Sequence, residues 1–181
     1  MSKVITFGLS SKEIKRAITE IEEYKKQFLT KVEIFRKRVA DETKSLAQSG
    51  FNGAVVDDIL PGFEGRRRAE VVVEVEHSSD GTISVVYTNS ADAIWVEFGA
   101  GVYYNGSVGG SPHPKGVSLG YTIGGYGKGM GKGDTWGYYS DPKGKSGLVL
   151  THGTPARMPM YNALKEIRTK VVSIAKEVFG K

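Results

Sequence analysis

Histidine, cysteine and paired carboxylates carry most metal and acid-base chemistry in proteins. The three histidines of this chain lie far apart in the sequence. His77, His113 and His152 never recur at the i, i+4 spacing that would put two metal ligands on one helix face. The sequence has no cysteine, which excludes disulfides, thiolate nucleophiles and cysteine-ligated zinc. We therefore interpret each histidine as a solvated or hydrogen-bonding group, and we expect neither a metal nor a cofactor.

Short motifs for phosphate binding and acid catalysis are incomplete. Gly144-Lys145-Ser146 resembles the end of a phosphate-binding loop, but Tyr139 stands where that motif needs a glycine. The glycines of residues 124–133 recur mostly at every second position, which does not match a dinucleotide-binding turn. Asp57-Asp58 is a carboxylate pair in a predicted turn and has no histidine near it in sequence. The residues predict a protein that is not an enzyme, and the alternative is a hydrolase with a dispersed active site.

Composition indicates an ordinary soluble globular chain. Its 181 residues are 39% hydrophobic and 25% charged, which suits a single domain over residues 1–181. The formal net charge of +5 and the pI near 9.3 favour approach to polyanions, so a basic DNA-binding protein is an alternative function. No signal peptide and no run of about 20 apolar residues is present, so we expect synthesis in a cytoplasm and no membrane partner.

The first third of the chain predicts one long amphipathic helix. Ser10 and Glu13 form a capping-box pattern, and Ser49-Gly50 offers a stop, so the helix is expected over residues 11–48. Apolar side chains recur along it at spacings of three, four and seven: Ile14, Ile18, Ile21, Phe28, Val32, Phe35 and Val39. One small domain cannot cover such a helix, so part of the stripe is expected to pack against a neighbouring subunit or a folded-back segment. The alternative is a helical hairpin broken at residues 27–30.

The middle of the chain predicts a linker followed by an antiparallel β-hairpin. Residues 51–68 contain several turn-forming Gly and Pro residues and end in a basic triplet of Arg66, Arg67 and Arg68. Val71, Val73 and Val75 then alternate with Val72, Glu74 and Glu76, and a second β-type run covers residues 83–87. The Ser-Ser-Asp-Gly turn between the two runs joins them as a hairpin.

The C-terminal half combines two helices with a long insertion. Ser90 can cap a short helix that ends at Gly99, and Pro159 opens a closing amphipathic helix that ends before Gly180. Between them, residues 101–147 are rich in glycine and aromatic residues and predict a long surface insertion, followed by a short strand over residues 148–151. The order helix, hairpin, short helix, insertion, strand, helix predicts an α+β fold.

The insertion has the composition of an interaction surface. It mixes lysines with aromatic residues such as Tyr126 and Trp136, a combination found in protein interfaces and in grooves for single-stranded nucleic acid. Gly-rich loops with aromatic anchors can become ordered on docking, which suits assembly between subunits. A solvated loop without a partner is the alternative.

Two motifs resemble a known family. Ala93-Ile94-Trp95-Val96-Glu97-Phe98-Gly99, and later Thr154-Pro155-Ala156-Arg157-Met158-Pro159-Met160-Tyr161-Asn162-Ala163-Leu164, resemble the tail-completion, or head-tail joining, proteins of long-tailed phages. With the long first helix and the hairpin, the resemblance covers most of the chain outside the insertion. Two departures are the Met158-Pro159-Met160 triplet, where the family more often has Pro-Phe-Leu, and the longer insertion.

The resemblance implies a non-catalytic structural subunit of the virion neck, assembled in the host cytoplasm. It implies a homo-oligomeric ring of about six or twelve copies. The implied partners are a connector or stopper, a tail-terminator and tail-tube proteins, with DNA passing non-specifically through the lumen. A tail-terminator or another tail structural protein is the alternative within this class.

Several residues are candidates for these contacts. Trp95, Glu97, Phe98 and Arg157 lie in the two motifs, with Tyr126 and Trp136 in the insertion, and are expected to contact protein partners. Arg66, Arg67 and Arg68 could face the DNA path. A guanidinium binds a carboxylate well, so we predict a contact between Glu97 and Arg157, within one subunit or between two.

Overall fold

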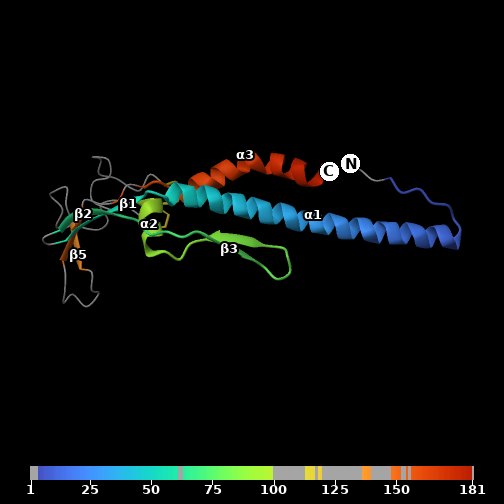
Figure 1. Cartoon of the computed structure of the whole chain (residues 1–181), viewed down its shortest axis with the longest axis horizontal. Coiled ribbons are helices and arrows are strands. Elements are labelled where there is room, and N and C mark those ends of the chain that lie inside the picture. The colour runs from blue at the N-terminus through green and yellow to red at the C-terminus, as the bar shows by residue number, and fades with distance from the viewer. Residues whose placement is uncertain are drawn as a thin grey trace.

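The computed structural model confirms an α+β fold with a long first helix, two small antiparallel sheets, a short helix and a closing helix (Figure 1). It describes residues 4–60, 63–99, 113–116, 118–119, 136–139, 148–151, 154 and 156–180, without the side chains of residues 57–66, 136–139 and 148–151. No helix in that part of the chain is both long and apolar enough to cross a membrane.

Helix α1, Ser11–Phe51, is continuous over 41 residues, so it extends for roughly 60 Å at 1.5 Å per residue. The predicted cap at Ser10 is present, because Ser10 Oγ accepts a hydrogen bond from the Glu13 amide and donates one to the Glu13 carboxylate. The alternative of a helical hairpin broken at residues 27–30 is wrong. Unbroken backbone hydrogen bonding carries the apolar stripe of α1 well beyond the rest of the fold (Figure 1).

The predicted end of α1 at Gln48, with a stop at Ser49-Gly50, is three residues early. Gly50 lies inside the helix, and its missing side chain admits α3, since a Cβ there would lie 2.7 Å from Cβ of Pro159. The helix ends at Asn52, whose amide donates to the carbonyl of Gln48, and the turn follows at Gly53 with φ of 70°. Gly50 is therefore a residue of close helix packing.

Helix α3, Pro159–Phe179, lies along the C-terminal half of α1 (Figure 1). Its buried Ile167, Ile174 and Val178 pack against Phe35, Val39 and Leu46 of α1. Phe179, the last residue of α3, packs on α1 at the end of this contact. The centroid of its ring lies 5.9 Å from that of Phe28 and 5.7 Å from that of Phe35. The N-terminal half of α1 continues past this point without α3.

The predicted hairpin is confirmed as β3, Glu74–His77, paired with β4, Ser84–Tyr87. It contacts α1, and Figure 1 places it on the side of the helix away from α3. The preceding residues 71–73 do not join the ladder. Instead the side-chain amide of Gln48 on α1 pairs with them, donating to the Val71 carbonyl (2.9 Å) and accepting from the Val73 amide (2.8 Å).

Residues 51–68 are not the linker or loop that the sequence predicts. They include β1, Val55–Leu60, and β2, Phe63–Arg68, which pair as a hairpin. β5, Trp136–Tyr139, and β6, Leu148–Thr151, complete a four-stranded sheet in the order β2-β1-β6-β5. Asp57 and Asp58 therefore lie within a strand and not in the predicted turn.

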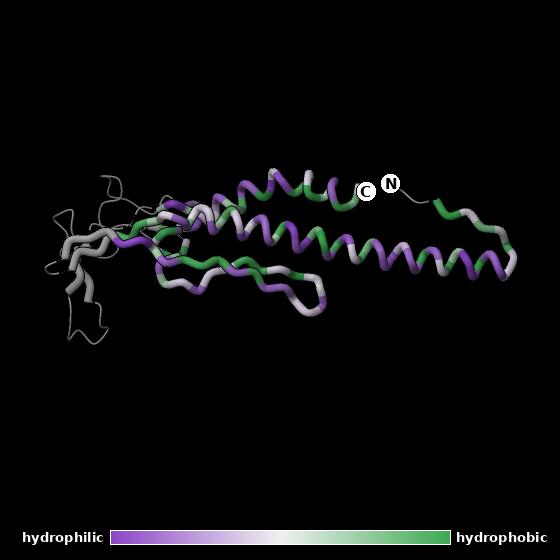
Figure 2. Tube along the Cα trace, viewed as in Figure 1, coloured by the Kyte–Doolittle hydropathy of each residue, from purple (hydrophilic) through white to green (hydrophobic). Residues whose placement is uncertain are grey.

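The main core lies at the junction of these elements. Its largest fully buried side chains are Phe51 from the end of α1, Val73, and Val96 from α2, Ala91–Phe98. Figure 2 shows apolar and polar residues alternating along α1, so one stripe of the helix faces this core and α3 while the other faces are polar.

We predict that stability depends on the α1 to α3 contact. Ile174→Ala removes a buried side chain from that contact and should lower the free energy of unfolding by about 2–4 kcal/mol. Val172→Ala, at an exposed position of the same helix, should change it by less than about 0.5 kcal/mol. Urea unfolding followed by circular dichroism measures both, and equal effects would contradict the packing described.

Candidate functional site

The carboxylate of Glu97 joins α2 to the start of α3. Only 7% of Glu97 is exposed, and its two oxygens accept hydrogen bonds from the backbone amides of Met160 (2.8 Å) and Tyr161 (3.0 Å). These are the second and third residues of α3, whose amides have no carbonyl partner inside the helix. Glu97 thus performs, from a distant segment, the role of an N-cap side chain.

The start of α3 needs this outside cap. Pro159 occupies the first helical position and suits its fixed φ, but the N-cap residue is Met158, which has no side-chain acceptor. Met158 also has a φ of 54°, a left-handed conformation that few non-glycine residues adopt. A buried negative charge at the positive end of the helix dipole stabilises this start.

His113 holds Glu97 from the other side. Its Nε2 lies 3.2 Å from Oε1 of Glu97, and its Nδ1 accepts a hydrogen bond from the Lys115 amide at 3.0 Å. The imidazole lies between the rings of Phe98 (centroids 4.5 Å apart) and Tyr161 (5.2 Å apart).

Backbone contacts bring together the two motifs that carry the family resemblance. The Arg157 amide donates to the Val96 carbonyl at 2.8 Å, and Gly99 lies against Thr154 and Ala156. Gly99 has a φ of 78°, and a Cβ there would lie 3.0 Å from the Ala156 nitrogen. Only glycine suits this position. We call the assembly of Glu97, His113, Gly99 and the start of α3 the clasp.

The predicted contact between Glu97 and Arg157 does not form within the chain. Glu97 points at the α3 amides and His113, while the Arg157 side chain is exposed and contributes only its backbone to the clasp. Pro159 and the left-handed Met158 present two free amides to Glu97, and a helix start supplies these donors without ordering a long guanidinium side chain. A contact between Glu97 of one subunit and Arg157 of another stays a prediction.

The polar side chains of the clasp already contact other groups of the same chain. Both oxygens of Glu97 accept hydrogen bonds, and His113 contacts Glu97 through Nε2 and the Lys115 amide through Nδ1, so neither group is positioned as a free general base. A cavity of about 870 Å³ adjoins them and is lined mainly by apolar side chains such as Phe51, Val86 and Leu164. Such a lining can hold apolar groups by burial. Within the described residues, no cluster of three or more His, Cys, Asp or Glu side chains could hold a metal ion.

The arginine triplet is divided by the geometry of β2. Arg67 forms a two-pronged ion pair with Asp92, at 2.6 and 2.7 Å, and Asp92 also accepts from the Glu70 amide at 3.0 Å. Arg67 therefore ties β2 to the first turn of α2, and its contact with DNA stays a prediction. Arg68 is exposed, and the side chain of Arg66 lies outside the described part of the structure.

The other predicted contact residues are placed less completely. Trp95 is 37% exposed on α2, as expected of a residue available to a partner. Phe98 is half-buried against His113, so it serves the clasp. Trp136 is on β5 with its side chain outside the described residues, and Tyr126 lies outside them altogether.

Sequence reasoning missed His113 and Asp92 as organising residues. His113 stands between Pro112 and Pro114, and two prolines hold a segment rigidly, which is a signal that the imidazole has a fixed partner. Asp92 occupies the first turn of a helix, where a carboxylate is common, so its ion pair with Arg67 had no distinctive signal.

The N-terminal half of α1 presents an uncovered apolar face. Ile18 and Ile21 are each 51% exposed, although they continue the stripe that α3 covers farther along. The segment of residues 4–10 turns back beside the start of α1 (Figure 1), and Ala17 is buried. The isoleucines remain open to solvent.

No family model, curated protein or solved structure matches this chain.

We predict that the clasp is a major source of stability. Glu97→Gln removes the negative charge and leaves a buried amide beside two backbone donors, so the free energy of unfolding should fall by about 2–4 kcal/mol. Glu22→Gln, on an exposed part of α1, should have almost no effect. Urea titration gives the energies, and hydrogen exchange should show faster exchange of the Met160 and Tyr161 amides in Glu97→Gln alone.

We also predict that the Arg67–Asp92 ion pair makes stability depend on acid pH. The Arg67 guanidinium, followed by the Glu70 amide, holds the pKa of Asp92 below its usual 3.8, against the opposing effect of burial. Asp92 therefore stabilises the fold above about pH 4, and this contribution is lost as pH falls through the lower pKa of the folded protein.

Asp92→Asn and Arg67→Gln should each flatten the fall in stability below pH 4, and the double variant should be no worse than the more harmful single one. Urea unfolding at several pH values measures this. Additive losses in the double variant would show that the two side chains act independently.

Proposed function

We propose that the protein is a non-catalytic structural subunit that forms a ring at the head-tail junction of a long-tailed phage. The observation that carries the proposal is the uncovered apolar face on the N-terminal half of α1. The resemblance of the two clasped motifs to head-tail joining proteins supports this setting. A tail-terminator, which also forms a ring, is the alternative within the same class.

The uncovered face calls for a protein partner. Soluble monomers seldom expose long rows of large aliphatic side chains, because water contact with each costs free energy. Here Ile14, Ile18 and Ile21 follow one another on a helix that projects past α3. Covering them by another subunit would recover that free energy.

The clasp supports a role for the insertion in assembly. Gly99 and the segment around Ala156 are held together by backbone contacts, so the chain that enters and leaves residues 100–155 passes through one point of the fold. This arrangement is compatible with a long insertion between the two motifs. Tyr126 and Trp136 in the insertion, with Trp95 on α2, are proposed to contact the neighbouring connector, terminator or tube proteins.

The basic residues fit a weak, non-specific contact with passing DNA. Arg66 and Arg68 are proposed to face the lumen, whereas Arg67 is committed to Asp92. The net charge of +5 would favour this encounter. A connector of this kind should bind free DNA weakly, and a dedicated DNA-binding protein would show tight binding that falls steeply with salt.

The test is to make virions without this chain. Filled heads and separate complete tails should accumulate, and supplying the intact chain from a plasmid should restore joining. Glu97→Gln and Ile18→Asp supplied in the same way should fail for different reasons, the first through lost stability and the second through lost assembly of a folded subunit. Normal joining in the absence of the chain would overturn the proposal.

A further inference from the structure

The free part of the α1 stripe forms a defined surface. We call Ile14, Ile18, Ile21 and Lys25 the helix surface, and their spacings of four, three and four residues place them on one side of α1. All are exposed, and the next stripe residue, Phe28, already contacts Phe179 at the end of α3. The helix surface is thus a direct continuation of the α1 to α3 interface.

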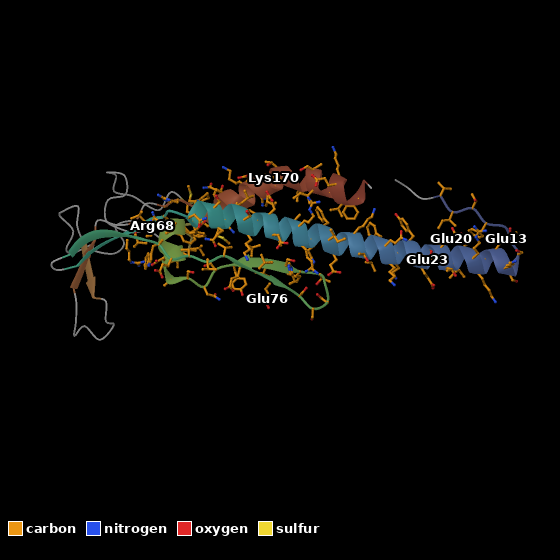
Figure 3. The ribbon with its side chains drawn as sticks, viewed as in Figure 1. Glu13, Glu20, Glu23, Arg68, Glu76 and Lys170 are labelled. Carbon is orange, nitrogen blue, oxygen red and sulfur yellow. The ribbon has the colours of Figure 1, made fainter. Side chains whose placement is uncertain are left out.

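The covered half of the stripe shows what its occupant should look like. In the half of the stripe that α3 covers, one position is charged, Glu42. Its carboxylate forms an ion pair with Lys170 of α3 at 2.8 Å (Figure 3 labels Lys170). In the helix surface the charged residue is Lys25, which forms no ion pair with any described residue. The complementary occupant is apolar and carries a carboxylate that can reach Lys25.

One surface of the same chain has this composition. In the β3–β4 register, Glu76 lies opposite Val85 and Glu74 opposite Tyr87 on one face, while Val75 and Val86 alternate onto the other face. Figure 3 shows Glu76 on the side of the hairpin away from α1. Three apolar residues on this outer side are also exposed. We call the whole set the hairpin surface: Val72, Glu74, Glu76, Ile83 and Val85.

A chain cannot join its own two surfaces. The hairpin is anchored beside Arg36, whose guanidinium donates to the carbonyl of Ile83. Ile18 lies roughly 27 Å from Arg36 along α1 at 1.5 Å per residue, and the helix is continuous between them. The contact therefore requires two copies.

Pairing two helix surfaces with each other is unfavourable. A parallel, in-register pair sets Lys25 against Lys25, and an antiparallel pair centred on Ile21 sets Glu20 against Glu22. Opposing like charges destabilise either arrangement. The glutamates of the hairpin surface instead complement Lys25.

We propose that the helix surface of one copy docks on the hairpin surface of the next copy. This contact is head-to-tail, because each copy uses two different patches, and repetition of such a contact closes a ring when the rotation allows. The inference rests on the proposed function and specifies the interface through which the ring forms.

The natural absence of cysteine allows a direct test by disulfide trapping. A chain with both Ile18→Cys and Val85→Cys should give a ladder of covalent oligomers under mild oxidation, in concentrated purified protein and in assembled particles. Each single variant should give almost no dimer, since its cysteine meets no second cysteine in a head-to-tail contact. Ile18→Cys with Leu164→Cys, an exposed site on α3, is the matched control and should give no ladder.

The outcomes separate this contact from the proposed function. Dimers from Ile18→Cys alone would overturn the contact in favour of a symmetric helix pair. Particles that contain the chain but give no ladder would also overturn it, while leaving the ring function intact. Absence of the chain from particles, with normal joining, would overturn the function itself.

A charge exchange gives a second, independent test. Lys25→Glu and the double variant Glu74→Lys/Glu76→Lys should each weaken self-association at least about tenfold, measured by sedimentation. An equal mixture of the two should recover it, because each copy then meets a neighbour of opposite charge. Lys26→Glu and Glu23→Lys make the same kinds of charge change off the stripe and should leave association unchanged. Failure of the mixture to recover would count against the docking.

Discussion

The capping of α3 by Glu97 is the interaction on which the body of this protein depends. A buried carboxylate is costly unless it is well hydrogen-bonded, and Glu97 meets that condition through two amides of α3, with His113 3.2 Å away. In return α3 acquires the cap that Met158 cannot provide. Because α3 also covers the C-terminal half of α1, one side chain determines how α2, α3 and α1 are placed.

The clasp also separates the packed body from the parts that are free to vary. Gly99 and Ala156 lie in close contact on either side of a long stretch of chain, and His113, within that stretch, also contacts Glu97. Gly50 serves the same closure, since it lets Pro159 approach the last turn of α1. Small residues at these two points give the body its tight junctions, and larger side chains there would push α3 away from its partners.

The long helix has the opposite character. Its C-terminal half is buried under α3 and the β3–β4 hairpin, while its N-terminal half continues the same apolar stripe into solvent. A stripe that no described part of the chain covers supports the proposed docking of a second copy. Two charged residues stand in that stripe, Lys25 and Glu42, and Glu42 forms an ion pair with Lys170 of α3, so the proposed partner should carry a negative charge opposite Lys25.

The sequence by itself determined the elements with strong local patterns. The capping box at Ser10 and the apolar spacing define α1, the alternating valines and the Asp-Gly turn define the β3–β4 hairpin, and Pro159 marks the start of α3. These depend on neighbours a few residues apart. The β1–β2 hairpin was missed because its turn-forming residues masked a weak alternation.

Only the tertiary structure decided which distant groups meet. Glu97 pairs with helix amides and His113, not with Arg157, and Arg67 pairs with Asp92, because a carboxylate takes whichever donors the packing brings close. Such choices depend on contacts across 16 or more residues of chain, between Glu97 and His113, up to 64, between Glu97 and Tyr161. No local pattern encodes them, since charge and hydrogen-bonding capacity state what a residue can bind but not which partner will be near.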